Sequence, residues 1–180
     1  MFVQTEKTPN PNSLKFLPGK IVSNNGSFEV TKKEETDNDL VRNLLSINGV
    51  SSVFLGKDFI SINKSTNKNW EEIKHIAISL INEYYLTGKN FVIASSLLEE
   101  KKSDFIEIEK KIIKILDTKI RPAVAKDGGD IKFKEFKDGI VKVELQGSCS
   151  GCPSSTMTLK QGVQNLLCHY LPEVKEVQAI

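Results

Sequence analysis

Residues 127–155 read DGGDIKFKEFKDGIVKVELQGSCSGCPSS, and this stretch decides the fold of the C-terminal half of the chain. Residues 131–136 and 140–145 alternate apolar and polar side chains, which predicts two half-buried strands. Residues 138–139 between them are Asp-Gly, a dipeptide that favours a two-residue hairpin turn. Pro153, which suits the first turn of a helix, follows the Gly and Cys residues. The stretch therefore predicts a β-hairpin, then a glycine-rich loop that carries cysteine, then a helix.

Helical patterns flank this hairpin on both sides. From about Asp104 apolar residues recur at helical spacing, and Pro122 either disrupts this helix or restarts it as a new first turn. A second long helix is expected over residues 154–170, and residues 174–179 alternate again and predict a closing strand. The residues expected on the inward face of this second helix are Met157, Val163, Leu166, Leu167 and Tyr170. The expected order is helix–strand–strand–helix–strand.

The N-terminal half predicts a second small unit of strands and helices. Its expected elements are strands at 2–4, 14–16 and 28–30, a helix at 39–47, a hairpin at 50–63 and a helix starting after Asn69 and ending at Gly88. Residues 8–12 (TPNPN) predict a turn, because Pro and Asn both interrupt strands. We therefore expect an α/β protein of the α+β type, built from two small domains. The first covers residues 1–89, a linker covers 90–103, and the second domain covers 104–180.

Composition excludes several classes of protein. The chain has 25 Lys and Arg against 23 Asp and Glu, and Arg42 and Arg121 are its only arginines, so nucleic acid is not an expected partner. No apolar run approaches the roughly 20 residues of a membrane span. The first residues lack the features of a secretion signal, and three cysteines do not make a disulfide framework. We expect the cytoplasm of a bacterium, or an organelle matrix if a presequence has been removed.

Cys149 and Cys152 are the strongest chemical signal. The two residues between them allow both sulfurs to converge on one metal or on each other. Gly147 and Gly151 permit tight backbone conformations in which amide groups point at sulfur. We expect the start of the following helix to lower the thiol pKa, and the thiolate is the form that binds metal. The alternative, two buried cysteines that act as small hydrophobes, fits poorly beside so many Gly and Ser residues.

One chain is two ligands short of a complete metal site. Iron–sulfur clusters and structural zinc sites normally use four thiolate or imidazole ligands. Cys168 lies on the same helix as Pro153, roughly 24 Å beyond Cys152 at 1.5 Å per residue, so its expected role is packing. A four-thiolate site therefore requires a second subunit. A cluster held in this way is exposed and can be lost, which suits a carrier better than an electron-transfer protein.

The remaining polar residues point to little chemistry. His75 and His169 are expected to be surface or satisfied core residues. Asp127 and Asp130 could be paired carboxylates, but a helix cap and a turn explain them more simply. The chain has no Ser-His-Asp pattern and no phosphate-binding loop, so no catalytic residue is assigned and an enzyme is not expected.

Several stretches match the pattern of a known family. Residues 121–131 (RPAVAKDGGDI), 147–155 (GSCSGCPSS) and 158–160 (TLK) resemble the C-terminal domain of NifU, and residues 8–16 (TPNPNSLKF) resemble the N-terminal domain of Nfu-type proteins. The resemblance implies an iron–sulfur cluster scaffold or carrier. In that family a [4Fe–4S] cluster bridges two subunits and is delivered to recipient apoproteins.

The resemblance also implies residues and partners. Both cysteines of the family motif are present as Cys149 and Cys152, and Cys168 inherits no role. The implied partners are recipient iron–sulfur apoproteins, upstream cluster-assembly proteins and a second copy of the chain, with neither nucleic acid nor a membrane. For the N-terminal domain, partner contact or modulation is implied.

Two other classes remain open. One is a thiol–disulfide oxidoreductase, although a thioredoxin-like domain usually has an aromatic residue where Ser148 stands before the first Cys. The other is a zinc site shared between subunits, which visible absorbance after anaerobic reconstitution would distinguish from a cluster.

Overall fold

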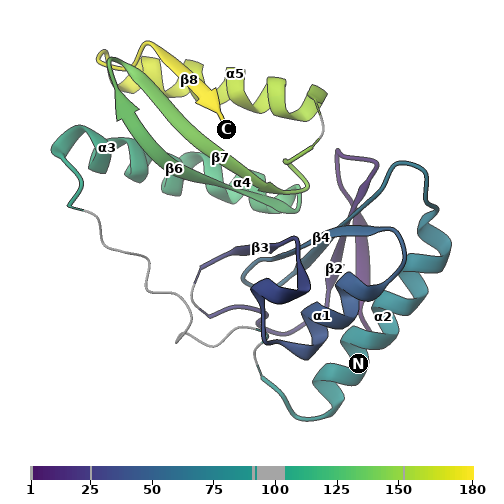
Figure 1. The fold of residues 1–180 in the computed structure, drawn as a ribbon. Helices are drawn as coiled ribbons and strands as arrows, with labels where there is room; N and C mark the ends of the chain where they lie inside the picture. Colours follow the sequence, from purple (N-terminus) through teal and green to yellow (C-terminus); the bar gives the residue numbers. More distant parts are fainter. Residues whose placement is uncertain (1, 25, 91, 93–103, 152) are drawn as a thin grey trace.

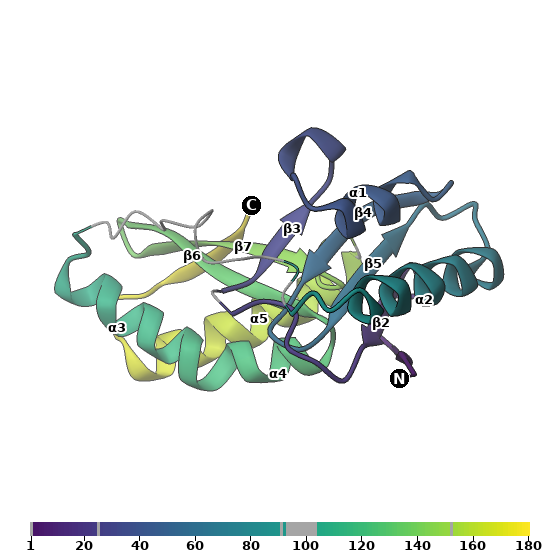
Figure 2. The same ribbon diagram turned by 90° about the horizontal axis from the view of Figure 1, so that it is seen from below.

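A computed structural model describes residues 2–24, 26–90, 92, 104–151 and 153–180. Within these residues the chain forms two units, each a sheet with helices packed on one face (Figures 1 and 2). The expected α+β class is confirmed, as is the helix–strand–strand–helix–strand order of the C-terminal unit. None of the helices among the described residues combines the length and the apolar composition that crossing a membrane requires.

The N-terminal unit is a five-stranded antiparallel sheet with the strand order β1-β2-β5-β4-β3. Its elements are β1 (Gln4–Lys7), β2 (Ser13–Leu17), β3 (Phe28–Val30), η1 (Lys33–Glu35), α1 (Asp39–Ser46), β4 (Val50–Leu55), β5 (Ile60–Lys64) and α2 (Trp70–Leu86). Both helices begin where the sequence predicts, because the side chains of Asn38 and Asn69 accept hydrogen bonds from first-turn amides.

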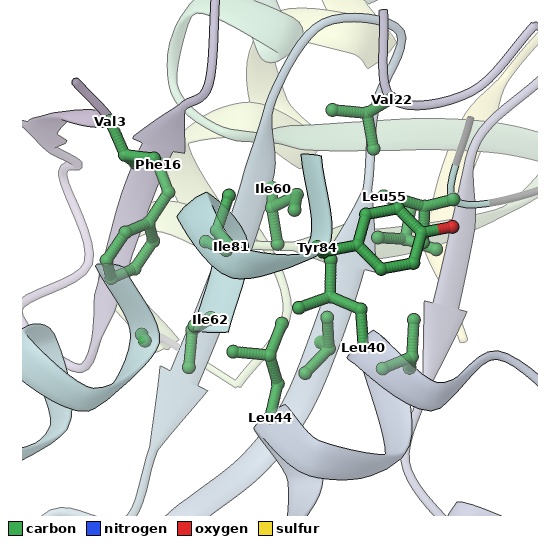
Figure 3. Packing of buried hydrophobic residues seen from close by; sticks show 14 of the residues in the cluster. Val3, Phe16, Val22, Leu40, Leu44, Leu55, Ile60, Ile62, Ile81 and Tyr84 are labelled. Atoms are coloured by element: carbon green, nitrogen blue, oxygen red, sulfur yellow. The ribbon is translucent and has the colours of Figure 1, made fainter. Parts of the chain in front are cut away.

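One face of this sheet and the two helices enclose the N-terminal hydrophobic core. Side chains that alternate along the strands, such as Phe16, Ile60 and Ile62, meet Leu44 of α1 and Ile81 of α2 (Figure 3). All five are fully buried. The helices α1 and α2 therefore cover one face of the sheet and leave its other face available for contact with the C-terminal unit.

The C-terminal unit is a three-stranded sheet in which β7 lies between β6 and β8. Its elements are α3 (Glu107–Ile115), a π-helical turn η3 (Leu116–Ile120), α4 (Arg121–Lys126), β6 (Gly129–Lys137), β7 (Ile140–Gly147), α5 (Pro153–Tyr170) and β8 (Glu176–Ala179). Strand β6 pairs antiparallel and β8 parallel with β7. The hairpin turn is made by Asp138 and Gly139, whose φ angles of 53° and 79° fit the predicted Asp-Gly turn.

Pro122 restarts the helix, which is one of the two outcomes that the sequence left open. It stands in the first turn of α4, directly after the π-helical turn, where its missing N–H costs no hydrogen bond. Val124 of α4, Leu116 of η3 and Ile112 of α3 enter a hydrophobic cluster with Val163 of α5. The divided helix thus packs on the same face of the sheet as α5.

Three predicted details are wrong. The first strand begins at Gln4 rather than Phe2, because Gln4 pairs with Leu17 and the next residue, Pro18, has no N–H to continue the ladder. Met157 is 73% exposed and Tyr170 48% exposed, although both were predicted to face inward.

The geometry of an α-helix explains the exposed position of Met157. The six-residue step from Met157 to the buried Val163 turns about 240° around the helix, so the two cannot share a face. Tyr170 is the last residue of α5, and the Nζ atom of Lys119 lies 5.3 Å from the centroid of its ring.

The first helix of the C-terminal unit starts at Glu107 instead of about Asp104. Phe105, which precedes it, contacts the ring of Phe133 on β6, with the centroids 5.7 Å apart. Most of the expected linker, residues 90–103, lies outside the described residues. Val92 is buried in the N-terminal core, and its carbonyl accepts a hydrogen bond from Asn38 at 2.6 Å.

The two units contact each other along the face of the N-terminal sheet that α1 and α2 do not cover. Strands β3, β4 and β5 all approach β7, the central strand of the other sheet. In Figure 1 the end of β7 that leads into α5 lies next to the N-terminal unit. This contact includes the loop on which the sequence places the first candidate cysteine.

Candidate functional site

The cysteine loop, defined as residues 147–152, connects β7 to α5. Gly147 has φ +68° and Gly151 φ +74°, conformations that favour glycine. A Cβ on Gly147 would lie 2.6 Å from the carbonyl oxygen of Gly128, so no larger residue fits there. The Ser150 amide and hydroxyl both donate to the Gly147 carbonyl, at 3.2 Å and 2.9 Å. The predicted tight loop is therefore present over its described residues.

Cys149 is turned into the C-terminal unit, where only 7% of the residue is exposed. It belongs to the hydrophobic cluster that also contains Val124 and Val163. Its sulfur packs so closely on Gly129 that a Cβ there would lie 2.7 Å from Sγ. In this structure the thiol packs as a small hydrophobe, the state that the sequence disfavoured.

Burial raises the pKa of the Cys149 thiol to about 11. A hydrogen bond with Ser148 lowers the pKa, whereas the carboxylates of Asp127 and Asp130 raise it further. The predicted lowering of this pKa is therefore wrong for the arrangement seen here, because desolvation of the buried thiolate is the largest influence on the pKa. Metal binding requires the thiolate, and burial of Cys149 opposes its formation.

The other cysteines are placed differently. Cys152 lies outside the described residues, between the exposed Gly151 and the start of α5 at Pro153. Cys168 is partly buried and packs against the C-terminal hydrophobic cluster, in agreement with its expected packing role. Both histidines, His75 and His169, are exposed. Over the residues that the structure describes, no three His, Cys, Asp or Glu residues are arranged to hold a metal ion.

Asp130, the second residue of β6, forms an ion pair with Arg121 of α4. Its two carboxylate oxygens accept from Arg121 Nε and Nη2, both at 2.8 Å, and its Oδ1 also accepts from the Ile131 amide. Ser27 of the N-terminal unit donates to the same carboxylate. Burial acts to raise the pKa of Asp130, but the hydrogen bonds from Arg121 and Ser27 outweigh it and hold the pKa below its usual value.

The two aspartates are not paired carboxylates. Asp127 ends α4, as predicted, and its backbone carbonyl accepts from the Ser148 hydroxyl. Gly128, with φ +83°, follows as the residue that turns the chain into β6. Asp130 is an ion-pair partner rather than part of a turn, which its sequence neighbours did not reveal.

Sequence reasoning missed a group of N-terminal residues around the cysteine loop. The side chains of Asn10, Ser61 and Asn63 all donate to backbone carbonyls between Gly128 and Ser150. The alternation of polar and apolar residues in β2 and β5 predicts a polar face but does not say what covers it.

Glu29 of β3 also reaches the cysteine loop. Its carboxylate accepts from Ser52 at 3.0 Å and from Ser150 at 3.4 Å. Burial raises the pKa of Glu29, and hydrogen bonds from Ser52, the Gly147 backbone and Ser150 oppose the rise.

A pocket of about 640 Å³ opens beside Cys149 between α4 and α5. Val124, Leu159 and Val163 make most of its wall apolar, and Pro9 of the N-terminal unit completes the wall. The pocket gives the thiol a nonpolar surrounding and shows that the N-terminal unit contributes to it directly.

The fold and the site together define a class of protein: two small α+β units, of which one carries a glycine-flanked thiol loop at the start of a helix. The NifU-like domain family matches residues 112–178, and the family of the Nfu/NifU scaffold-protein N terminus matches residues 3–88. These two matches cover the two units in the order that the sequence resemblance implies.

Similar proteins agree over the full chain. The chain is 43% identical over 183 residues to the Homo sapiens protein "NFU1 iron-sulfur cluster scaffold homolog, mitochondrial", covering 100% of this chain and 72% of that protein. It is 40% identical over 185 residues to the Arabidopsis thaliana "NifU-like protein 4, mitochondrial", covering 99% of this chain and 65% of that protein. The chain thus spans about two thirds of the length of these relatives.

Among solved structures, a NifU-like protein from Saccharomyces cerevisiae is 29% identical with a TM-score of 0.47, and the match covers 52% of this chain and 85% of that one. On the strength of the sequence matches, this chain belongs to the Nfu/NifU-like family of iron–sulfur cluster scaffolds, which are carriers and not enzymes.

Proposed function

We propose that this protein binds a [4Fe–4S] cluster as cargo between two subunits, through Cys149 and Cys152 of each, and transfers it to recipient apoproteins. The observation that carries the proposal is the cysteine loop at the start of α5, in a domain that matches the NifU-like family. Four thiolates complete such a cluster, and each chain supplies two.

The partners follow from this cargo. Upstream assembly proteins supply the cluster, and recipient apoproteins with better preorganised thiolates displace one subunit's pair at a time. We expect transfer to be faster than spontaneous release into buffer, because a mixed complex keeps the cluster ligated throughout.

The remaining assignments concern location and organisation. The protein works in the bacterial cytoplasm or in an organelle matrix, and its relatives named above are mitochondrial by name. Its domains are residues 1–89 and 104–180, joined by a linker over residues 90–103.

The test is anaerobic reconstitution with iron and sulfide, followed by visible absorption and by iron and sulfide analysis. We expect Cys149→Ser and Cys152→Ser each to abolish cluster binding, because either change leaves the dimer with two thiolates. Cys168→Ser is the matched control and retains most of the cluster, since Cys168 packs in the hydrophobic cluster. Unchanged iron content in Cys149→Ser would refute the assignment. A shared zinc site would instead retain metal without visible absorption, and a thiol–disulfide oxidoreductase would cycle between dithiol and disulfide without iron.

A further inference from the structure

The face of the N-terminal sheet opposite α1 and α2 carries polar side chains on β5 beside the buried ring of Phe54 on β4, and the C-terminal unit covers it. Ser61 is 1% exposed and Asn63 9% exposed, and both stand on β5. Buried polar side chains require hydrogen-bond partners. Here Ser61 Oγ donates to the carbonyl of Gly128 at 2.6 Å, and Asn63 Nδ2 donates to the carbonyl of Gly147 at 2.9 Å. The two acceptors lie on the two chain segments that flank Cys149 in space.

Asn10 supplies the third contact from the turn that precedes β2. It is 4% exposed, and its Nδ2 donates to the carbonyls of Ser148 and Ser150 at 3.1 Å and 3.4 Å. These two carbonyls belong to the neighbours of Cys149 on either side. The neighbouring residue Pro9 lines the same pocket as Cys149.

The contacts hold the backbone of the cysteine loop from outside while the thiol packs inside. With the carbonyls on both sides of Cys149 held by the N-terminal unit, the loop cannot turn the side chain outward without losing those hydrogen bonds. Cluster binding between two copies needs the thiol at the surface, where a second chain can reach it.

We propose that Asn10, Ser61 and Asn63 are positioning residues that form a latch, which holds Cys149 inward until the two units separate at this contact. The inference rests on the proposed function for its consequence, because cluster loading and the approach of a second copy both require the released loop. It gives the N-terminal domain a defined role in regulating access to the cluster-binding thiol.

The chemistry of the latch makes it reversible. Each of its hydrogen bonds exchanges for a hydrogen bond with water on opening, so its net contribution is modest. The side chains of Asn10, Ser61 and Asn63 are polar and lose little by meeting solvent, whereas the apolar ring of Phe54 beside Gly147 opposes opening. An apolar contact of the same size would resist separation more strongly.

The test measures access to Cys149 directly in the full-length apo protein. In a Cys152→Ser background, Cys149 is the only thiol of the tryptic peptide 143–160, and Cys168 is the only thiol of peptide 161–175. Iodoacetamide labelling at fixed pH, followed by mass spectrometry, therefore gives a separate rate for each thiol. When opening is fast compared with labelling, the rate follows the population of the open state.

Two variants weaken the latch and one is a matched control. Ser61→Ala removes one donor, and Asn10→Asp removes another while keeping the Oδ1 that accepts from the Asn12 amide at 3.0 Å. Each is expected to raise the Cys149 labelling rate roughly 3- to 10-fold. Ser46→Ala removes a hydroxyl that donates to the Arg42 carbonyl within α1, at 2.7 Å, and leaves the rate unchanged.

Cys168 reports whether an effect is local. An unchanged Cys168 rate beside a faster Cys149 rate supports the latch. Unchanged Cys149 rates in both variants refute it, and so does an equal acceleration of Cys168, which would mean that the contacts only stabilise the fold.

With Cys152 restored, Ser61→Ala is also expected to acquire visible cluster absorption faster than wild type, and no faster acquisition would count against the latch. The labelling assay contains no iron, so its outcome is independent of whether the cluster assignment itself is right.

Discussion

Asp130→Asn should destabilise the C-terminal unit by about 2 kcal/mol. The wild-type carboxylate accepts two charge-assisted hydrogen bonds from Arg121, both at 2.8 Å, and its side chain is 7% exposed. A hydrogen bond to a charged group contributes roughly 1.5–3 kcal/mol, and Asn keeps one of the two acceptors. The loss stays near 2 kcal/mol, below the ~3–5 kcal/mol of a fully buried pair, because Arg121 is 37% exposed and water can solvate it.

Urea unfolding measures this change against a matched control. Circular dichroism follows both units, whereas fluorescence of Trp70, the only tryptophan, follows the N-terminal unit alone. At roughly 1 kcal/mol per M for a unit of this size, the circular dichroism midpoint should fall by about 2 M. Asp117→Asn removes the other, exposed partner of Arg121 and should cost only about 0.5 kcal/mol.

The dependence of the free energy of unfolding on pH provides a second test of the Asp130 ion pair. The pKa of Asp130 is lowered by folding, so its contribution is complete above the unfolded pKa of about 4 and is lost as pH falls toward the folded pKa. The stability gap between wild type and Asp130→Asn should therefore be constant from pH 7 to about pH 5 and shrink near pH 3. An Asp130→Asn cost equal to that of Asp117→Asn, or a gap that does not narrow in acid, would refute this reasoning.

Three further predictions concern the linker between the domains, the assembly of subunits and the packing around the Cys149 thiol. A fragment that starts at Ser103 should fold and accept a cluster; a soluble, dimer-competent fragment that binds no iron would mean that the first domain supplies a ligand or a contact for the cluster. Apo protein should be mainly monomeric and loaded protein dimeric by sedimentation, since a cargo bound only by the dimer favours it through mass action; a loaded monomer with four irons and no added thiol would contradict bridging. Gly129→Ala places a Cβ 2.6 Å from the Gln146 carbonyl and 2.7 Å from Cys149 Sγ, and should lower stability by about 2 kcal/mol. Gly162→Ala, on α5 with open space around it, should instead raise stability by about 1 kcal/mol. Thermal melts of both glycine variants measure the two changes.

Local signals in the sequence were enough to predict most of the secondary structure. The Asp138-Gly139 turn and the Asn69 cap each depend on the conformational preference of the residue itself, which no distant contact has to supply, whereas at Pro122 the sequence left disruption and restart of the helix both open. The same holds for the cysteine loop, where Gly147 and Gly151 adopt the positive φ angles that glycine permits. The error at Met157 arose because this residue lies off the single stripe of α5 that the sheet covers, and the error at Tyr170 arose at the last residue of the helix.

The order of the elements, the two-unit architecture and the position of Cys149 on a loop between strand and helix were thus determined by the amino-acid sequence, because they follow from backbone preference and short-range periodicity. Only the tertiary structure decided that the polar face of the N-terminal sheet lies on that loop, and that Cys149 turns inward with a raised pKa. A serine or asparagine on a strand has the same local pattern whether water or a carbonyl of another unit receives its hydrogen bond. The partner is chosen by how two distant surfaces fit, and that information is spread over residues far apart in the sequence, from 67 positions for Ser61 and Gly128 to 138 for Asn10 and Ser148.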